Sequence, residues 1–294
     1  MAQIINNLIA TWYEEQSFEE IVNFVENQST NDKNVDDITF TIIAAAYANL
    51  GRSDCAQKYY ELAIQMNVNA FEAKNNLAVI LMEKGDTEQA EKLFLEVIEF
   101  NPKRVDSLVN TGNLYYNSQS YSKAEKYYSQ ALKIDHKIQN LLYQLGMSKA
   151  AQGHFEDAIK SLQEIYREEP ENYVVNFEIG TCNFNLEKFD LALTSFKNCA
   201  KIRPEDPLVH LNIGTCQLRK GNYTKALTSY ETALAYDENL VDALYHTGLI
   251  YVEESNNSSA ITSFTKALAI DPDHDGSMEC ILDLIQGFSL EDSA

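Results

Sequence analysis

Apolar residues along most of the chain recur in steps of three and four, and short polar breaks interrupt them at regular intervals. One such stretch carries Leu77, Ala78 and Leu81, and the next carries Ala90 and Phe94. This spacing places the apolar side chains on one face of a helix, so each stretch is predicted to be an amphipathic α-helix. The whole pattern returns every 34 residues.

A frame of 34 positions, called slots 1 to 34, describes this recurrence. Slot 1 falls at Asp37, Phe71, Val105, Gln139, Tyr173, Pro207 and Val241. Slot 20 is always alanine: Ala56, Ala90, Ala124, Ala158, Ala192, Ala226 and Ala260. Slot 8 is always small: Ala44, Ala78, Gly112, Gly146, Gly180, Gly214 and Gly248. Slot 24 is always large: Tyr60, Phe94, Tyr128, Leu162, Phe196, Tyr230 and Phe264. Small and large residues can interdigitate, so slots 8 and 24 are predicted to meet at a close helix–helix interface.

Glycine and proline mark two breaks in the frame. Slot 15 is glycine at Gly51, Gly85, Gly153 and Gly221. Slot 32 is proline at Pro102, Pro170, Pro204 and Pro272. Because both residue types favour helix ends, each frame is predicted to hold two helices separated by turns. One helix pair cannot bury its apolar face alone, so the pairs are expected to stack into an array with a continuous core.

These slots resemble the tetratricopeptide repeat, with a small residue at slot 8, alanine at slot 20, a ring at slot 24 and proline at slot 32. Slot 27 is also small in four frames, although Val97, Ile165 and Cys199 occupy it in three others. The resemblance covers residues 37–274, which are expected to be seven tetratricopeptide repeats. It implies an all-α fold, a right-handed superhelical solenoid of stacked antiparallel helix pairs.

Both ends of the chain depart from the frame. Residues 2–35 hold a weaker copy in which Ile9 and Ile21 replace the small residues, so residues 1–36 are predicted to be a degenerate N-terminal repeat and a linker. The polar run at 27–36 is the expected linker. Residues 275–294 are predicted to form a C-terminal capping helix and a tail, with the helix ending at Gly287. The apolar residues of that helix are Met278, Ile281, Leu282 and Ile285.

Charge and cysteine content narrow the function classes. The chain has 23 basic and 44 acidic residues, a net charge of −21, which repels nucleic acid and anionic membrane surfaces. No signal peptide and no run of 18 apolar residues is apparent. The 5 cysteines are an odd number and form no dense framework of pairs. These features favour a protein of the reducing cytoplasm, with no membrane insertion.

No set of residues converges in the way that a catalytic or metal site requires. The histidines stand in five different slots: His136, His154, His210, His246 and His274. No zinc-protease motif, phosphate-binding glycine loop or nucleophile elbow is present. The sequence therefore predicts no enzyme, no cofactor and no metal.

Three cysteines in neighbouring frames invite a chemical interpretation. Cys182 and Cys216 share slot 10 of adjacent frames, and Cys199 lies between them. Equivalent positions on packed helices are separated by roughly 8–10 Å, which exceeds the reach of a disulfide or a shared zinc ion. All three are predicted to be small apolar fillers of the core.

The resemblance implies that the first helix of each repeat lines a concave groove with slots 2, 5, 6, 9, 12 and 13. Slots 5 and 12 are apolar and partly aromatic at Tyr143, Phe177, Leu211, Tyr245, Phe184 and Leu218. Slot 6 carries amides at Asn76, Asn110, Gln144 and Asn212. Aromatic rings provide a large contact area, and amides can pair with an extended backbone, so these residues are candidate partner contacts. Alternatively, the rings fill space between repeats, and asparagine is simply common at slot 6 in this family.

The charged slots of this expected groove are mostly acidic, as at Asp106 and Asp242, and Arg219 is their only basic residue. No repeat has lysine at slot 5, which the co-chaperones of this family use to clamp an acidic C-terminus. The expected partner is therefore a protein or peptide that is apolar with neutral or basic character.

Three functions remain open at this point. The favoured one is a non-enzymatic scaffold that binds an extended or helical segment of a partner protein in its concave groove. The alternative is a structural subunit of a larger assembly, including a homo-oligomer, that contacts other chains through its convex face or ends. A regulatory piece of a larger enzyme is disfavoured because no catalytic segment follows the capping helix.

Overall fold

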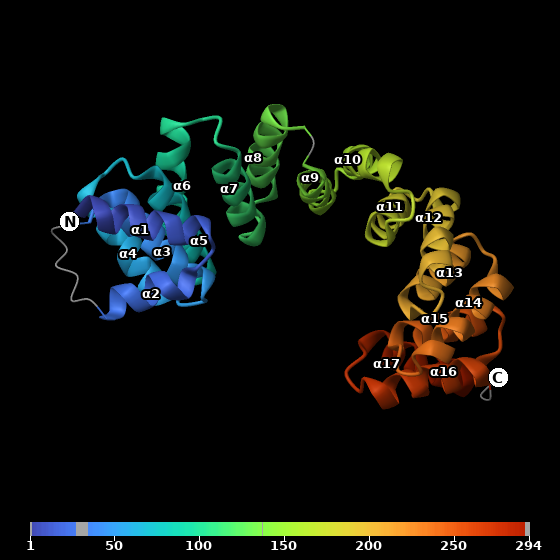
Figure 1. The fold of residues 1–294 in the computed structure, drawn as a ribbon. Coiled ribbons are helices and arrows are strands. Elements are labelled where there is room, and N and C mark those ends of the chain that lie inside the picture. The colour runs from blue at the N-terminus through green and yellow to red at the C-terminus, as the bar shows by residue number, and fades with distance from the viewer. Residues whose placement is uncertain (1, 28–34, 137, 292–294) are drawn as a thin grey trace. The chain divides into compact units, whose positions relative to one another are not determined.

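Helices form where the steps of three and four predict them. The computed structural model describes residues 2–27, 35–136 and 138–291, and these residues form α-helices and no strands (Figure 1). They belong to two compact bodies, residues 1–148 and residues 149–294, which are described separately. The boundary between the bodies falls within α9 (Gln139–Ala151).

The N-terminal body contains α1 (Ala2–Glu14), α2 (Phe18–Asn27), α3 (Asp37–Asn49), α4 (Ser53–Met66), α5 (Phe71–Glu83), α6 (Thr87–Phe100), α7 (Val105–Asn117) and α8 (Tyr121–Ile134). The C-terminal body contains α10 (Phe155–Glu168), α11 (Tyr173–Asn185), α12 (Phe189–Ile202), α13 (Pro207–Arg219), α14 (Tyr223–Tyr236), α15 (Val241–Glu253), α16 (Asn257–Ile270) and α17 (Asp275–Glu291).

The 34-residue frame matches these bounds in every repeat. The first helix, called the A helix, occupies slots 1–13, and the second, called the B helix, occupies slots 17–30. Consecutive helices pack against each other from α3 to α8 in one body and from α10 to α17 in the other. The prediction of an all-α solenoid of stacked helix pairs is therefore confirmed.

The turn between the A and B helices has the same backbone at slot 15 in all seven repeats. Gly85 has φ +85°, and Glu187, which is not a glycine, has φ +57°. Gln119 and Ser255 adopt the same left-handed conformation, which costs a residue with a Cβ about 1–2 kcal/mol. The register therefore imposes this turn even where the sequence does not supply glycine.

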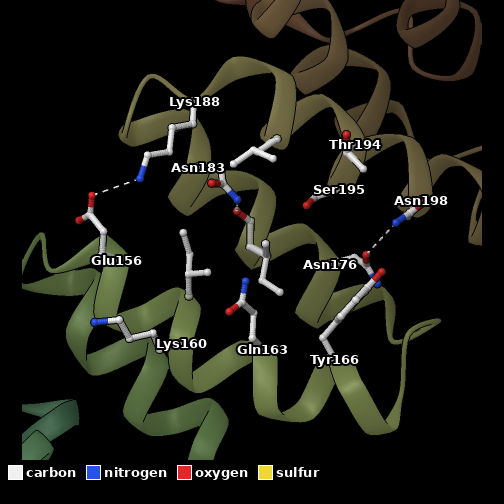
Figure 2. Close-up of a pocket in the computed structure, with 13 residues that line it drawn as sticks. Glu156, Lys160, Gln163, Tyr166, Asn176, Asn183, Lys188, Thr194, Ser195 and Asn198 are labelled. Carbon is white, nitrogen blue, oxygen red and sulfur yellow. Dashed lines mark hydrogen bonds and ion pairs between the residues drawn. The ribbon is translucent and has the colours of Figure 1, made fainter.

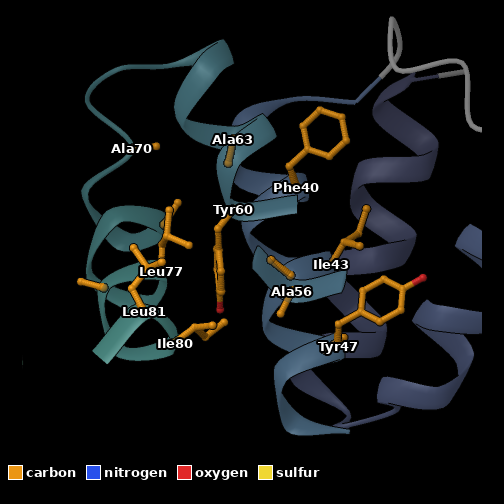
Figure 3. Close-up of a cluster of buried hydrophobic side chains, with 14 of the residues drawn as sticks. Phe40, Ile43, Tyr47, Ala56, Tyr60, Ala63, Ala70, Leu77, Ile80 and Leu81 are labelled. Carbon is orange, nitrogen blue, oxygen red and sulfur yellow. The ribbon is translucent and has the colours of Figure 1, made fainter. Parts of the chain in front are cut away.

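Slot 24 of the B helix packs against slot 8 of its own A helix, as predicted, in repeats 3, 5, 6 and 7. Tyr128 is 1% exposed, and a Cβ built on Gly112 would lie 2.3 Å from its Cε1 atom. Gly214 and Tyr230 repeat this arrangement, with 2.5 Å between the corresponding atoms. In repeat 1, Tyr60 lies between the side chains of α3 and those of α5 (Figure 3).

The N-terminal helices α1 and α2 pack on each other and on α3. Ile9 and Ile21 are buried there in place of the small residues of the later repeats. Of the expected linker at 27–36, Asn27 belongs to α2, and Asp36 caps α3 by accepting a hydrogen bond from the Thr39 backbone amide at 2.8 Å. Residues 28–34 lie outside the described residues.

The C-terminal helix α17 packs on α16, but one prediction about it is wrong. It continues through Gly287 to Glu291 instead of ending at the glycine, so the expected tail begins at least three residues later. A glycine inside a helix costs about 1 kcal/mol relative to alanine, which a packed helix tolerates. Residues 292–294 lie outside the described residues.

The three central cysteines are core residues, as predicted. Cys182 is 2% exposed, Cys199 and Cys216 are 0% exposed, and all three thiols are free. Burial disfavours the thiolate, so it raises the pKa of Cys182 and of Cys199 to about 11 and the pKa of Cys216 to about 12. The repeated "IGTC" sequence therefore marks the register of the repeats.

We predict that Gly112→Ala destabilises the protein by about 1–3 kcal/mol, because the added methyl group collides with the buried Tyr128 ring. Urea unfolding followed by circular dichroism measures the cost. In the double variant Gly112→Ala/Tyr128→Leu the collision is gone, so its cost should be smaller than the sum of the two single costs. Strict additivity of the two costs would contradict the proposed contact.

We predict that iodoacetamide at pH 8 modifies Cys55, which is partly exposed, well before Cys182, Cys199 and Cys216. Peptide mass spectrometry of the native and the urea-unfolded protein measures the rates. Equal native rates at Cys55 and Cys216 would contradict the burial described above.

Folding raises the pKa of the buried thiols of Cys182 and Cys199. Their contribution to the free energy of unfolding is therefore complete below the unfolded thiol pKa of about 8.5 and is lost as pH rises toward 11.

Candidate functional site

All the candidate groove residues lie on A helices, and they are divided between the two bodies. The N-terminal body carries Asn76, Asp106, Asn110, Tyr143 and Gln144. The C-terminal body carries Phe177, Phe184, Leu211, Asn212, Leu218, Asp242 and Tyr245. Within each body the repeat frame places them at equivalent positions of stacked helices.

A hollow of about 300 Å³ lies between α3 and α5 in the N-terminal body. Its lining includes Asn49 of α3 together with Asn76, Val79 and Glu83 of α5. These residues occupy slots 13, 6, 9 and 13, which are groove slots of the sequence prediction. The predicted slots of repeats 1 and 2 therefore line a real hollow.

The tyrosine at slot 24 contributes a polar atom to this hollow. Tyr60 lines it, and its hydroxyl forms a hydrogen bond with the Asn76 side chain. Burial raises the pKa of Tyr60 to about 12, so the hydroxyl stays protonated at neutral pH. In repeats 3 and 6, Tyr128 and Tyr230 direct their hydroxyls to slot 9, at Asn113 (2.8 Å) and Thr215 (3.3 Å).

The apolar candidate residues of the C-terminal body are half-buried and pack partly against the core. Phe177 meets the edge of Phe196, with 5.5 Å between ring centroids. The centroid of Tyr245 lies 5.0 Å from that of His274, beside the start of α17. Leu211 and Leu218 pack against the cluster around Tyr230, and Phe184 packs against the cluster around Phe196. The rings therefore fill space between helices while they keep part of their surface exposed.

The amides at slot 6 already make contacts within the chain. Asn212 donates a hydrogen bond from Nδ2 to the Leu208 carbonyl at 2.7 Å. Oδ1 of Asn76 accepts one from Nδ2 of Asn75 at 3.2 Å. Each of these amides retains further hydrogen-bonding capacity, because an amide offers two donors and two acceptor lone pairs.

The sequence prediction missed one basic residue among the acidic slots. Arg104, at slot 34, donates a hydrogen bond to Glu72 at 2.6 Å and another to Asp106 at 2.8 Å. Both carboxylates raise the pKa of Arg104 and keep it charged. Glu72 and Asp106 both occupy slot 2 of neighbouring repeats, and Arg104 lies between them in the sequence. The positions of these three residues in the frame could therefore have predicted the cluster. Asp242 belongs to the C-terminal body, and its carboxylate is exposed.

A second hollow, which the sequence prediction did not include, has a volume of about 480 Å³ and lies among α10, α11 and α12 of the C-terminal body (Figure 2). We call it the B-helix pocket. Ile159, Ile179 and Leu191 supply apolar surface, and Gln163 and Asn183 are among its polar residues. None of its lining residues occupies a predicted groove slot.

Hydrogen bonds fix the walls of the B-helix pocket. Asn183 donates from Nδ2 to the Ile179 carbonyl at 2.9 Å, within α11. Asn198 of α12 donates to Oδ1 of Asn176 at 3.4 Å. At one end, an ion pair of 3.4 Å joins Lys188 to Glu156. Figure 2 shows this ion pair and the Asn198–Asn176 hydrogen bond on separate sides of the pocket.

Among the residues that the structure describes, no three His, Cys, Asp or Glu residues form a group that could hold a metal ion. No helix in the same residues is long and apolar enough to cross a membrane.

Solved structures with a similar fold include other repeat proteins. A tetratricopeptide repeat protein from Parabacteroides merdae matches with a TM-score of 0.59 and 15% identity, over 85% of this chain and 98% of its own. The C-terminal part of a repeat-containing protein from Cytophaga hutchinsonii matches with a TM-score of 0.58 and 17% identity, over 94% and 99%. YrrB, described as a TPR protein with an unusual peptide-binding site, matches with a TM-score of 0.52 and 24% identity, over 63% and 96%.

A comparison with curated proteins finds no match. Models of the tetratricopeptide repeat match residues 43–105 and 143–207, 105–138 and 241–274, and a further TPR repeat model matches residues 218–255. Together these matches cover more than half of the chain and agree with the helix pairs of the structure. The chain belongs to the tetratricopeptide repeat family.

Proposed function

We propose that this chain is a non-enzymatic scaffold that binds an extended or helical segment of a partner protein along slots 2, 5, 6, 9, 12 and 13 of its A helices. The observation that carries the proposal is the hollow between α3 and α5, since these slots line it. Membership of the tetratricopeptide repeat family supports a protein-interaction scaffold, and the peptide-binding site described for YrrB supports a peptide ligand.

The mechanism rests on preorganisation. The B helices hold the A helices in place, so the amides and half-exposed rings are ordered before a ligand binds. Most of the conformational entropy lost on binding is therefore lost by the ligand. Glu83 in the hollow and the exposed Asp242 favour a segment that is apolar with neutral or basic character. The net charge of −21 opposes nucleic acid, and the free, buried thiols suit the cytoplasm.

We predict that peptides selected on the purified protein from a random display library are enriched in apolar and basic residues. They should bind the variant with Tyr143, Phe177 and Tyr245 changed to alanine at least tenfold more weakly, because the ring contacts are lost. Isothermal titration measures the affinities. Asp242→Lys, at an exposed site, should lower the affinity for the basic peptides severalfold in low salt.

The matched control changes three exposed apolar residues of B helices, Leu95, Ile134 and Tyr236, to alanine. This variant should bind as the wild type does, and thermal melting establishes that both triple variants are folded. If the A-helix variant is folded and keeps its affinity while the control variant loses it, the partner segment does not lie on the predicted slots.

A second candidate function, a subunit that contacts another chain through the C-terminal end, is favoured by the outer face of α17. Met278, Leu282 and Ile285 are 45%, 52% and 53% exposed, although they are apolar and share one face of the helix. In the frame they occupy slots 4, 8 and 11. In repeats 3, 5, 6 and 7, slot 8 lies under the ring at slot 24, whereas Leu282 at slot 8 of α17 is half exposed.

If this face joins two copies of the chain, size-exclusion chromatography with light scattering will show a concentration-dependent dimer, and Leu282→Lys will abolish it. The acidic Asp275, Glu279 and Asp283 of α17 would repel their equivalents, so the dimer should strengthen between 0.15 M and 1 M salt. A wild-type protein that stays monomeric at both salt concentrations would remove self-association from this second function.

A further inference from the structure

The hollow between α3 and α5 is lined partly by apolar and partly by polar side chains. Its apolar lining residues are Ala45, Ala48, Val79 and Ile80. Its polar lining residues are Tyr13 of α1 together with Asn49, Ser53, Tyr60, Asn76 and Glu83. Among the described lining residues, Glu83 alone carries a charge at neutral pH. The hollow therefore combines a little apolar surface with one negative charge.

The Glu83 carboxylate is exposed, and no residue in the described part of the chain pairs with it. Lys84, the next residue in the sequence, donates a hydrogen bond from Nζ to Asp54 at 2.6 Å. Arg52, just before the second helix of repeat 1, pairs with Glu26 at 2.6 Å. The cations that neighbour the lining residues in the sequence thus have other partners, and Glu83 keeps its charge for a ligand.

Other groups of the hollow can accept hydrogen bonds. Asn49 donates from Nδ2 to the Ala45 carbonyl at 2.8 Å, which leaves its Oδ1 to accept from a ligand. Burial, and then the acidic groups of Tyr13 and Glu72, raise the pKa of Tyr60 to about 12, whereas a nearby cation would lower the pKa. The surroundings of the hollow are therefore rich in acceptors and acidic groups, which suits a cation.

The repeat frame does not impose a carboxylate on this position. Slot 13 ends every A helix, and the seven repeats place different residue types there: Asn49, Glu83, Asn117, Ala151, Asn185, Arg219 and Glu253. A residue that the packing required would recur, as alanine does at slot 20. Glu83 is therefore not needed for the fold, and Glu253 at the same slot of repeat 7 offers a matched comparison.

We propose that the hollow between α3 and α5 binds the cationic end of a lysine or arginine side chain from the partner segment. The cation would pair with Glu83 and donate to Oδ1 of Asn49, and its aliphatic stem would lie against Ala48 and Val79. The proposal names the chemistry of one part of the groove, so it rests on the proposed function.

Other occupants fit the hollow less well. Glu83 would repel a carboxylate or a phosphate. A wholly apolar side chain would remove water from Glu83 and Asn49 without replacing its hydrogen bonds, which costs free energy. A side chain with an aliphatic stem and a charged end matches both the apolar and the acidic parts of the lining.

The test uses acetylated five-residue peptides of alanine with lysine, arginine or acetyl-lysine at the centre. Titrations of the full-length protein in low salt follow the side-chain amide signals of Asn49 and Asn76 by nuclear magnetic resonance. The lysine and arginine peptides should give saturable shifts with dissociation constants on the order of 1 mM, which is reasonable for one anchored side chain. The acetyl-lysine peptide keeps the length but not the charge and should bind at least tenfold more weakly.

Three variants separate this hollow from the general attraction of an acidic chain for cations. Glu83→Gln removes the charge at nearly constant size and should weaken binding of the lysine peptide at least fivefold. Glu253→Gln removes an equal charge from slot 13 of repeat 7 and should leave binding unchanged. Ala48→Leu fills the hollow and should weaken binding at least tenfold. Leu218 stands at the same slot 12 in repeat 6, so the frame accommodates leucine there, and thermal melting establishes that each variant is folded.

Equal binding of the lysine and acetyl-lysine peptides would overturn the proposal. So would equal losses in Glu83→Gln and Glu253→Gln, which would indicate attraction to the overall charge alone. Unchanged binding to folded Ala48→Leu would place the cation outside the hollow.

The library-selected peptides distinguish failure of this proposal from failure of the proposed function. If they lose affinity for the alanine variant at Tyr143, Phe177 and Tyr245 but not for Glu83→Gln, the groove binds a segment and the hollow does not hold its cation. If instead the lysine peptide binds the hollow while the selected peptides bind that alanine variant normally, the proposed function is contradicted and the hollow remains a cation site.

Discussion

The contact between slot 24 and slot 8 is the constraint on which the rest of this structure depends. A large side chain of the B helix lies directly on a glycine or alanine of the A helix, as Tyr128 does on Gly112, where even a methyl group would collide. This approach fixes the distance and rotation between the two helices of a repeat. Every other slot then has a defined side of the helix pair, which separates the groove slots from the side of the B-helix pocket.

This constraint explains how well the sequence predicts the fold. The A and B helices begin and end at the same slots in all seven repeats, because the small and large residues at slots 8, 20 and 24 leave only one register. The prediction that failed concerns a residue outside the 34-residue frame. Gly287 was expected to end α17, but a glycine ends a helix only where the backbone takes the left-handed conformation, and a helix packed on α16 has no need to do so.

The candidate site was less predictable than the fold, for two physical reasons. A slot number says which side of the helix a residue faces but not how far its side chain reaches. Phe177 and Tyr245 face the expected side, yet each also packs against a neighbouring ring. Arg104 was missed because it lies between helices and reaches two of them. The B-helix pocket was not predicted, because its lining comes from three helices, and none of its residues, such as Asn183 and Ser195, occupies a groove slot.

Hydrogen exchange on the complex with a library-selected peptide shows whether the A helices recognise the partner segment. Exchange of backbone amides follows local opening, and a bound segment slows it where it contacts the chain. If the groove slots bind the segment, protection from exchange will concentrate in the A helices α3, α5 and α7 or in α11, α13 and α15. Protection confined to B helices such as α6, α8 and α14 would contradict binding at these slots.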